Sequence, residues 1–236
     1  MDNTLFRVKK EQVRMMQRRG YNIEREQAVL TMTLAEFNGV YTQFATQHEV
    51  SFRRALLNVY EKGEDRALVA FVDNTTKSKQ LGVDPVRAFI ALFQQFRCNQ
   101  GVLISQQPLS KDASDELGKT TAKFVQHFLE SEILTAAAAM GHFLSPGYEV
   151  VPDAEAVAFF RENRVRPMQL PTIHGHNPIA KYLGAGAGTL IRKNNDVIAG
   201  ETLVDKYRSY SIVDKTKIFL SLGIEILLID DIRSCN

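Results

Sequence analysis

Residues 170–188 read LPTIHGHNPIAKYLGAGAG, and this stretch decides more about the fold than any other part of the chain. Pro171 and Pro178 each restrict the backbone, so the chain is expected to enter this stretch in a rigid, extended form. Asn177 stands where a helix N-cap accepts a hydrogen bond, and the glycines after Leu183 can end a helix. The pattern predicts an extended segment, a turn, a short helix and a glycine-rich exit. Such a shape is suited to packing against another surface.

Two kinds of chemical site are alternatives for the same stretch. His174 and His176 alternate with a glycine, but a zinc site needs further ligands, and no cysteine or histidine stands nearby at ligand spacing. Gly184 to Gly188 has the glycine content of a phosphate loop, but a phosphate loop follows a strand and precedes a helix. Here the expected order is the reverse. The sequence therefore predicts no catalytic, cofactor-binding or metal-binding residue in this stretch.

The composition is typical of a globular protein. The chain has 236 residues, of which 44% are hydrophobic and 24% charged, with a net charge of +2. A protein that wraps nucleic acid alone usually has a larger basic excess, so tight autonomous DNA binding is not expected. Its two cysteines, Cys98 and Cys235, cannot form a disulfide framework, which favours a reducing compartment. The N-terminus lacks an apolar signal core, and the longest apolar run, 218–229, is too short to span a membrane.

The first half of the chain alternates helical and strand patterns. An apolar hairpin pair is expected over 55–60 and 67–72, and a short buried strand over 101–105. The ambiguous segment 124–134 is interpreted as a strand. Four helices are expected. The first spans residues 4–19, with Thr4 as N-cap and Gly20 as terminator, and the second spans 34–44, with a capping box of Thr33 and Glu36. The third runs from Asp84-Pro85 to about residue 96, and the fourth from the cap Ser110 to Leu117.

The second half begins after Ser145-Pro146-Gly147, the strongest turn signal in the chain. A helix capped by Asp153 is expected to run to Asn163, followed by strands over 189–193 and 207–213. The fold class is therefore α/β in the first half and α+β overall. The predicted divisions are an N-terminal domain over 1–145, a smaller C-terminal domain over 146–213 and an apolar extension over 214–236.

Three groups of polar residues leave functional alternatives open. Lys10, Arg14 and Arg18 form one stripe of the first helix, either a solvated face or a contact for nucleic acid or protein. Ser110 and Lys111 begin a helix after a strand, which fits either an ordinary capped turn or a contact with a DNA phosphate. The carboxylates Glu61, Glu64, Asp65 and Asp73 suggest either solvated hairpin residues or a nuclease-like core with Mg²⁺.

The chain resembles a known family, the two-domain common subunit of eukaryotic nuclear RNA polymerases. Its C-terminal half is similar to the small archaeal polymerase subunit that corresponds to the second domain alone. In the first half, the resemblance is carried by Arg19-Gly20-Tyr21 and by the strand ending in Gln106-Gln107. The matching signature positions in the second half are Leu170, Pro171, Ile173, Asn177 in place of an aspartate, Pro178, Ala180, Tyr182, Gly184, Gly188 and Tyr210.

The resemblance implies a function in assembly rather than catalysis. The subunit would be a non-catalytic component of a nuclear DNA-directed RNA polymerase, present once per complex and without a cofactor. Its C-terminal domain would dock on the largest subunit through the signature residues. Its N-terminal domain would form part of the lower jaw, with Ser110 and Lys111 near downstream duplex DNA.

Three departures from the family pattern suggest a specialised paralogue. They are Ser211 in place of an arginine, about six additional residues before Tyr207, and the tail after Asp214. The chain resembles the divergent paralogues of kinetoplastid protists, which implies service in RNA polymerase I and a nucleolar location. The alternatives are a nuclease-like α/β enzyme and a free-standing regulator that binds a protein through the tail.

Overall fold

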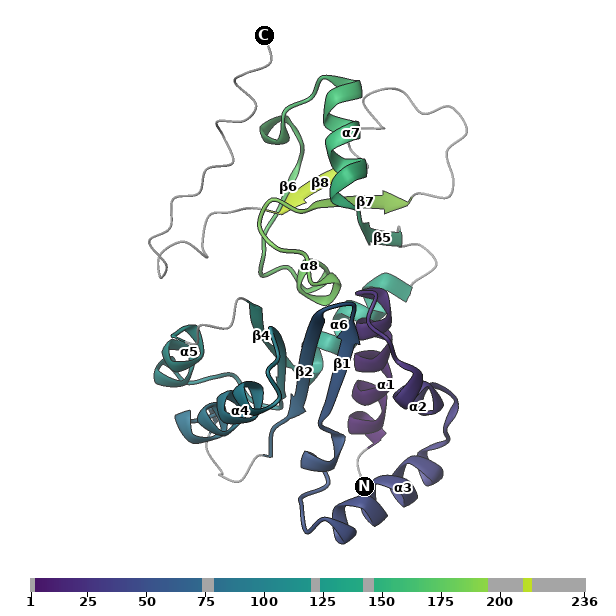
Figure 1. Ribbon diagram of the computed structural model, residues 1–236, viewed down its shortest axis with the longest axis vertical. Coiled ribbons are helices and arrows are strands. Elements are labelled where there is room, and N and C mark those ends of the chain that lie inside the picture. The colour runs from purple at the N-terminus through teal and green to yellow at the C-terminus, as the bar shows by residue number, and fades with distance from the viewer. Residues whose placement is uncertain (1–2, 74–78, 120–123, 142–146, 195–209, 214–236) are drawn as a thin grey trace.

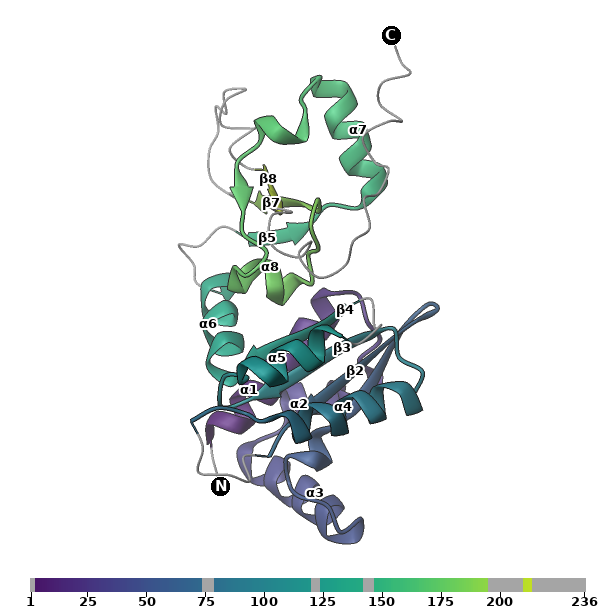
Figure 2. The ribbon, with the colours of Figure 1, turned by 90° about the vertical axis from the view of Figure 1, so that its left-hand side faces the viewer.

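The computed structural model describes residues 3–73, 79–119, 124–141, 147–194 and 210–213 (Figures 1 and 2). Two four-stranded sheets, one in each half of the chain, lie among helices. The predicted mixture of α and β structure in two parts is therefore confirmed. The expected domain limits stay a prediction, and the extension over 214–236 lies outside the described residues.

The first sheet combines a hairpin with a parallel extension. Its order is β1-β2-β3-β4, where β1 and β2 are antiparallel and β2, β3 and β4 are parallel. The hairpin turns at Gly63, whose positive φ of 59° favours glycine. The strands are β1 (Asn58–Lys62), β2 (Asp65–Phe71), β3 (Gln100–Ser105) and β4 (Phe124–Leu129).

Helices cover both faces of this sheet (Figure 1). Val69 and Phe71 of β2 belong to the core shared with α1 (Asn3–Arg18) and α6 (Glu130–Gly141). Leu68 and Ala70 of the same strand pack in the cluster formed with α4 (Val83–Gln95) and α5 (Lys111–Gly118). Because both faces are buried, the strand is apolar from Ala67 to Phe71 rather than alternating with polar residues.

Two predicted helix ends are confirmed. α1 ends at Arg18, and the chain turns away at Gly20, which has φ 82°, while Tyr21 N donates to Met16 O at 3.0 Å. Thr33 and Glu36 form the predicted capping box before α3 (Leu34–Gln47). The elements between α1 and the hairpin also include η1 (Glu24–Glu26), α2 (Gln27–Thr31) and η2 (Arg54–Leu56).

The second sheet has the order β5-β7-β8-β6. Its long helix, α7 (Asp153–Asn163), packs Phe159 against Val151, Leu170 and Leu190. The remaining elements are β5 (Gly147–Val150), η3 (Pro167–Gln169), β6 (Thr172–Ile173), α8 (Pro178–Leu183), β7 (Leu190–Asn194) and β8 (Tyr210–Val213).

The strand predicted over 124–134 is wrong in its second half. β4 ends at Leu129, and α6 begins at Glu130. Leu129 N donates to the Glu132 carboxylate at 3.1 Å, which stabilises the helix start. An alanine run follows in the same helix and favours it, because alanine has the highest helix propensity.

Three helices begin one or two residues away from their predicted starts. Thr4 lies inside α1, so it is not an N-cap. Gly82 precedes α4, which places Pro85 at the third helical residue, where a missing N–H still costs no intrahelical bond. Pro152 is the N-cap of α7, and Asp153 is its first residue, where a carboxylate still favours the helix dipole.

A buried polar network holds α1 on the hairpin. Lys9 is fully buried, and its Nζ lies 2.5 Å from a carboxylate oxygen of Glu26. Tyr60 donates its hydroxyl to Glu26 and accepts from Gln12 Nε2 at 2.9 Å. Burial lowers the pKa of Lys9, and the adjacent Glu26 carboxylate opposes this effect. Every member of the network has a partner, so its burial fixes the position of α1 at limited cost.

One hydrophobic core crosses between the two halves of the chain. The cluster that contains α1, β2 and α6 also contains six residues of the second half: Ala180, Tyr182, Leu183, Ala185, Ile191 and Val213. The two sheets are therefore joined by packing as well as by the chain. No helix in the described ranges is long and apolar enough to cross a membrane.

Candidate functional site

The stretch 170–188 folds as its composition predicts. Pro171 O accepts from Ile212 N at 2.9 Å, and Thr172–Ile173 then forms β6 beside β8. Asn177 caps α8 by accepting from Ile179 N at 2.9 Å, as predicted. The result is an extended edge strand, a turn and a helix of six residues.

Two physical features of the position after α8 favour glycine at residue 184. Its φ of 70° lies in the left-handed region. A Cβ atom at this position would also lie 3.2 Å from Arg19 Nε. The turn at Gly184 therefore lets the side chain of Arg19 approach the end of α8.

Arg19 joins the two halves of the chain. Its Nε donates to Tyr182 O at 3.0 Å, and its Nη2 donates to Lys181 O at 2.7 Å and to Gln126 Oε1 at 2.7 Å. Burial lowers the pKa of Arg19 to about 10, so the guanidinium stays charged at neutral pH. We call this arrangement the Arg19 joint. It links the end of α1, strand β4 and the last carbonyls of α8.

A second set of polar contacts lies beside the Arg19 joint. Lys181 Nζ lies 2.8 Å from the Glu132 carboxylate of α6 and 4.5 Å from the ring centroid of Phe128. Burial opposes the charge of Glu132, but the bond from Lys181 lowers its pKa. Ser105 Oγ lies 2.7 Å from His127 Nε2 and donates to Gln107 O at 2.6 Å. Since the Ser105 hydroxyl donates to a backbone carbonyl, the pair stabilises the strand ends rather than preparing a nucleophile.

The predicted interface residues divide by exposure. Leu170, Ala180 and Tyr182 are buried inside the chain, and Tyr182 donates its hydroxyl to Glu11 O at 3.2 Å. Those at the surface are Pro171 and Gly188, which are exposed, and Ile173, Asn177, Pro178 and Gly184, which are half-buried. Tyr210 lies in β8, where its backbone pairs with β7, and its side chain is outside the described set. The contact with a partner stays a prediction for all of them.

Ser110 and Lys111 lie where the sequence places them. Ser110 is the N-cap of α5 and accepts from Ala113 N at 3.2 Å, while Lys111 is exposed. Ser110 N donates to Leu81 O at 2.9 Å, which holds the loop beside the N-terminus of α4. The N-termini of α4 and α5 therefore lie at the same end of the parallel strands β2 and β3, and this arrangement favours binding of an anion.

The basic stripe of α1 is mostly occupied within the chain. Lys10 Nζ donates to Met32 O at 2.9 Å, Arg14 pairs with Glu11, and Arg18 Nη1 lies 3.9 Å from Met140 Sδ. His174 and His176 are exposed on the turn before α8. In the part of the chain that the structure covers, no three His, Cys, Asp or Glu side chains come together as a metal site would require.

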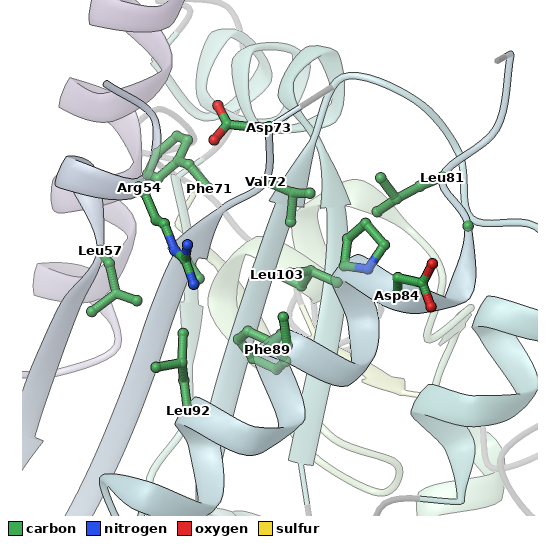
Figure 3. A pocket seen from close by; sticks show the side chains of 14 residues that line it. Arg54, Leu57, Phe71, Val72, Asp73, Leu81, Asp84, Phe89, Leu92 and Leu103 are labelled. Carbon is green, nitrogen blue, oxygen red and sulfur yellow. The ribbon is translucent and has the colours of Figure 1, made fainter. Parts of the chain in front are cut away.

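The carboxylates of the nuclease alternative are dispersed. Asp73 accepts from Ser51 Oγ, Glu61 pairs with Arg66 at 3.4 Å, Asp65 accepts from Asn99, and Glu64 is exposed. Asp73 and Asp84 border a cavity of about 400 Å³ between α4 and the C-terminal parts of β2 and β3 (Figure 3). The side chains of Leu57, Val72, Leu81, Phe89, Leu92 and Leu103 make its lining mainly apolar. Such a lining offers few of the oxygen ligands that Mg²⁺ prefers.

The role of Arg19 could not be derived from the sequence. Its Arg-Gly pair after a helix signals a helix end, but the contact at α8 spans 162 residues of sequence. The Lys9–Glu26 pair was missed for a similar reason, since a lysine within a helical pattern is usually exposed.

Comparison with known proteins identifies similarity in both halves. The pattern that defines the N-terminal domain of RNA polymerase Rpb5 matches residues 2–92, and the pattern of the Rpb5 C-terminal domain matches residues 138–213.

Relatives extend this similarity along most of the chain. The DNA-directed RNA polymerases I, II, and III subunit RPABC1 of Caenorhabditis briggsae is 22% identical over 212 residues, covering 89% of this chain and 95% of that protein. The corresponding Dictyostelium discoideum protein is 22% identical over 129 residues, covering 53% and 63%. The DNA-directed RNA polymerase subunit Rpo5 of Sulfurisphaera tokodaii is 37% identical over 67 residues, covering 28% and 80%.

The half-buried His127 predicts a stability change in mild acid. Burial, aided by the charge of Lys181, lowers its pKa from 6.5 to about 4, while Glu132 opposes the shift. Below the unfolded value the unfolded state binds more protons, so stability is lost as the pH falls from 6.5 toward 4. We expect about 2 kcal/mol of loss between pH 6.5 and about pH 5, since one pKa unit corresponds to about 1.4 kcal/mol.

Urea unfolding at both pH values measures this effect. His127→Gln keeps an amide near Ser105 and removes the titration, so its stability should change less over the same interval. An equal change in wild type and variant would show that His127 does not cause the pH dependence.

Proposed function

Because the chain belongs to the Rpb5 family of subunits of DNA-directed RNA polymerases, we propose that it assembles and positions parts of a polymerase without catalysing a reaction itself. Its C-terminal half docks on the largest subunit, and its N-terminal half forms part of the lower jaw near downstream DNA. The observation that carries the proposal is the Arg19 joint. A subunit that positions one element relative to another must hold its own two halves together.

The surface members of the signature supply the docking surface. β6 is at the edge of its sheet among the described strands; Thr172 on it is exposed, and Ile173 packs partly against the chain's own core. An edge strand presents unpaired backbone groups that a partner strand can use. Pro171, Asn177, Pro178 and Gly188 border the same segment. Leu170, Ala180 and Tyr182 contribute indirectly, because they hold this segment in place from inside the chain.

Contact with DNA is weak in this proposal. Lys111 supplies one exposed positive charge beside the N-termini of α4 and α5. Asp84 and Asp112 lie in the first turns of those helices and reduce the local positive potential. The loop at Ser110 and Lys111 therefore contacts duplex backbone only when neighbouring subunits hold the DNA there.

The polymerase class is a second, finer proposal. The Caenorhabditis briggsae relative is named as a subunit of RNA polymerases I, II and III, which supports a nuclear location. Ser211 and the inserted residues before Tyr207 depart from the family signature. We infer a paralogue restricted to one class, RNA polymerase I, with one copy per complex and a nucleolar location.

Affinity purification with mass spectrometry tests both proposals. We expect the tagged chain to recover the largest subunit of RNA polymerase I in excess over those of the other two classes. Equal recovery of all three largest subunits would contradict class restriction alone. Recovery of no polymerase subunit would contradict the main proposal and favour a free-standing regulator.

Substitutions separate docking from DNA contact. Thr172→Glu places a charge on the exposed side of the edge strand and should reduce incorporation about tenfold, because a desolvated, unpaired charge at an interface is costly. Lys111→Ala should leave incorporation unchanged and weaken DNA engagement by no more than about 1 kcal/mol. Gln43→Glu adds the same charge on the exposed face of α3, at the opposite end of the molecule from β6, and is the matched control (Figure 1). Similar incorporation of both glutamate variants and the wild type would exclude this docking surface.

A further inference from the structure

The end of α7 carries a cluster of exposed basic and apolar side chains. Arg161, Arg164 and Arg166 are all exposed, and Met168 is 91% exposed. We call residues 161–169 the arginine turn. Val157, one helical turn before Arg161 on the same face of α7, is 67% exposed and extends the apolar part of this surface.

The arginine turn is fixed by its own backbone. Val165 N donates to Phe160 O at 3.2 Å, Gln169 N donates to Arg166 O at 2.9 Å, and Arg166 N donates to Gln169 Oε1 at 2.8 Å. Leu170, which follows the turn, is buried against Phe159. The exposed side chains are therefore presented on a rigid support, which lowers the entropy cost of binding.

The three arginines are not required to stabilise α7. The terminal carbonyls of Phe160 and Arg161 accept backbone N–H groups of Val165 and Arg164, at 3.2 and 3.4 Å. The carboxylates of Glu149 and Glu155 pair with Arg192. Among the residues that the structure describes, no carboxylate forms an ion pair with Arg161, Arg164 or Arg166. Three guanidinium groups thus remain available on one turn.

The mixture of charge and apolar surface identifies the kind of ligand. Arginine and methionine are enriched at protein interfaces, where arginine binds carboxylates through two parallel hydrogen bonds. A nucleic-acid backbone would use the arginines but would leave Met168 and Val157 in water. An acidic protein segment with an apolar residue matches both components.

We propose that the arginine turn docks an acidic segment of a neighbouring polymerase subunit, and that apolar residues of this segment contact Met168 and Val157. The proposal rests on the proposed function and names the chemistry of one of its partners. α7 lies at the end of the molecule remote from α3 and the first sheet (Figures 1 and 2). The turn leads through the buried Leu170 to Pro171 and the edge strand β6, so the two contacts lie next to each other along the chain.

Site-specific crosslinking in the purified polymerase tests this inference. The photoreactive residue p-benzoylphenylalanine replaces Met168, and a control places it at the exposed Gln43 of α3. We expect position 168 to crosslink to a segment of another subunit that contains several Asp or Glu residues, and position 43 not to reach that segment. Crosslinks from position 168 to nucleic acid, to residues 214–236 of the same chain or to a segment without acidic residues would overturn the inference. So would the absence of any crosslink in the assembled enzyme.

Charge reversal provides an independent measurement. Arg164→Glu with Arg166→Glu should raise the dissociation constant for the rest of the polymerase about tenfold at moderate salt, since each exposed ion pair is lost and replaced by repulsion. Arg7→Glu with Arg25→Glu reverses two exposed arginines elsewhere and should have little effect. Equal effects of the two pairs would contradict the inference. Absence of the wild-type chain from purified polymerase would instead refute the proposed function on which it rests.

Discussion

The guanidinium of Arg19 lies between Gln126 and the last carbonyls of α8, and the position of the second sheet against the first depends on this contact. A guanidinium suits the site because its planar group donates several hydrogen bonds in fixed directions. Gly184 makes the contact possible, since a side chain there would crowd Arg19. Around this polar centre, Tyr182 and Ala180 complete a core that includes α1 and α6. The polar contact fixes orientation, and the apolar contact supplies most of the stabilisation.

The Arg19 joint explains why only part of the sequence signature at residues 170–188 is on the surface. The signature contains two kinds of residue with different physical tasks. Tyr182 and Gly184 face the first half of the chain and hold it, while Pro171 and Gly188 are exposed. A partner that binds the exposed residues therefore also binds a body whose position relative to the first sheet is fixed. That coupling is what a polymerase subunit needs if one half is to dock and the other is to extend toward DNA.

Local features of the fold were predictable from the sequence because their causes are local. The capping box at Thr33, the cap at Asn177 and the helix end at Gly20 each depend on residues within four positions. The prediction of a strand over 124–134 was wrong in its second half, because a short apolar run fits both the strand period and the helix period. The alanines after Glu130 favour the helix. The Arg19 joint and the Lys9–Glu26 pair could not be predicted, since each depends on tertiary contacts between distant parts of the chain. The division of interface residues into buried and exposed ones required the same information.

The most direct test of the account is whether the two halves unfold together, and whether Arg19 is the reason. The chain contains no tryptophan, so Phe96→Trp and Phe160→Trp can report separately on the first and second halves. With Arg19 present, urea unfolding followed by fluorescence should give coincident transitions for the two probes. Arg19→Met should separate them, with the second half unfolding at lower urea, while Arg14→Met on the exposed face of α1 should leave them coincident. Separate transitions with Arg19 present, or coincident and unshifted transitions in Arg19→Met, would contradict the account.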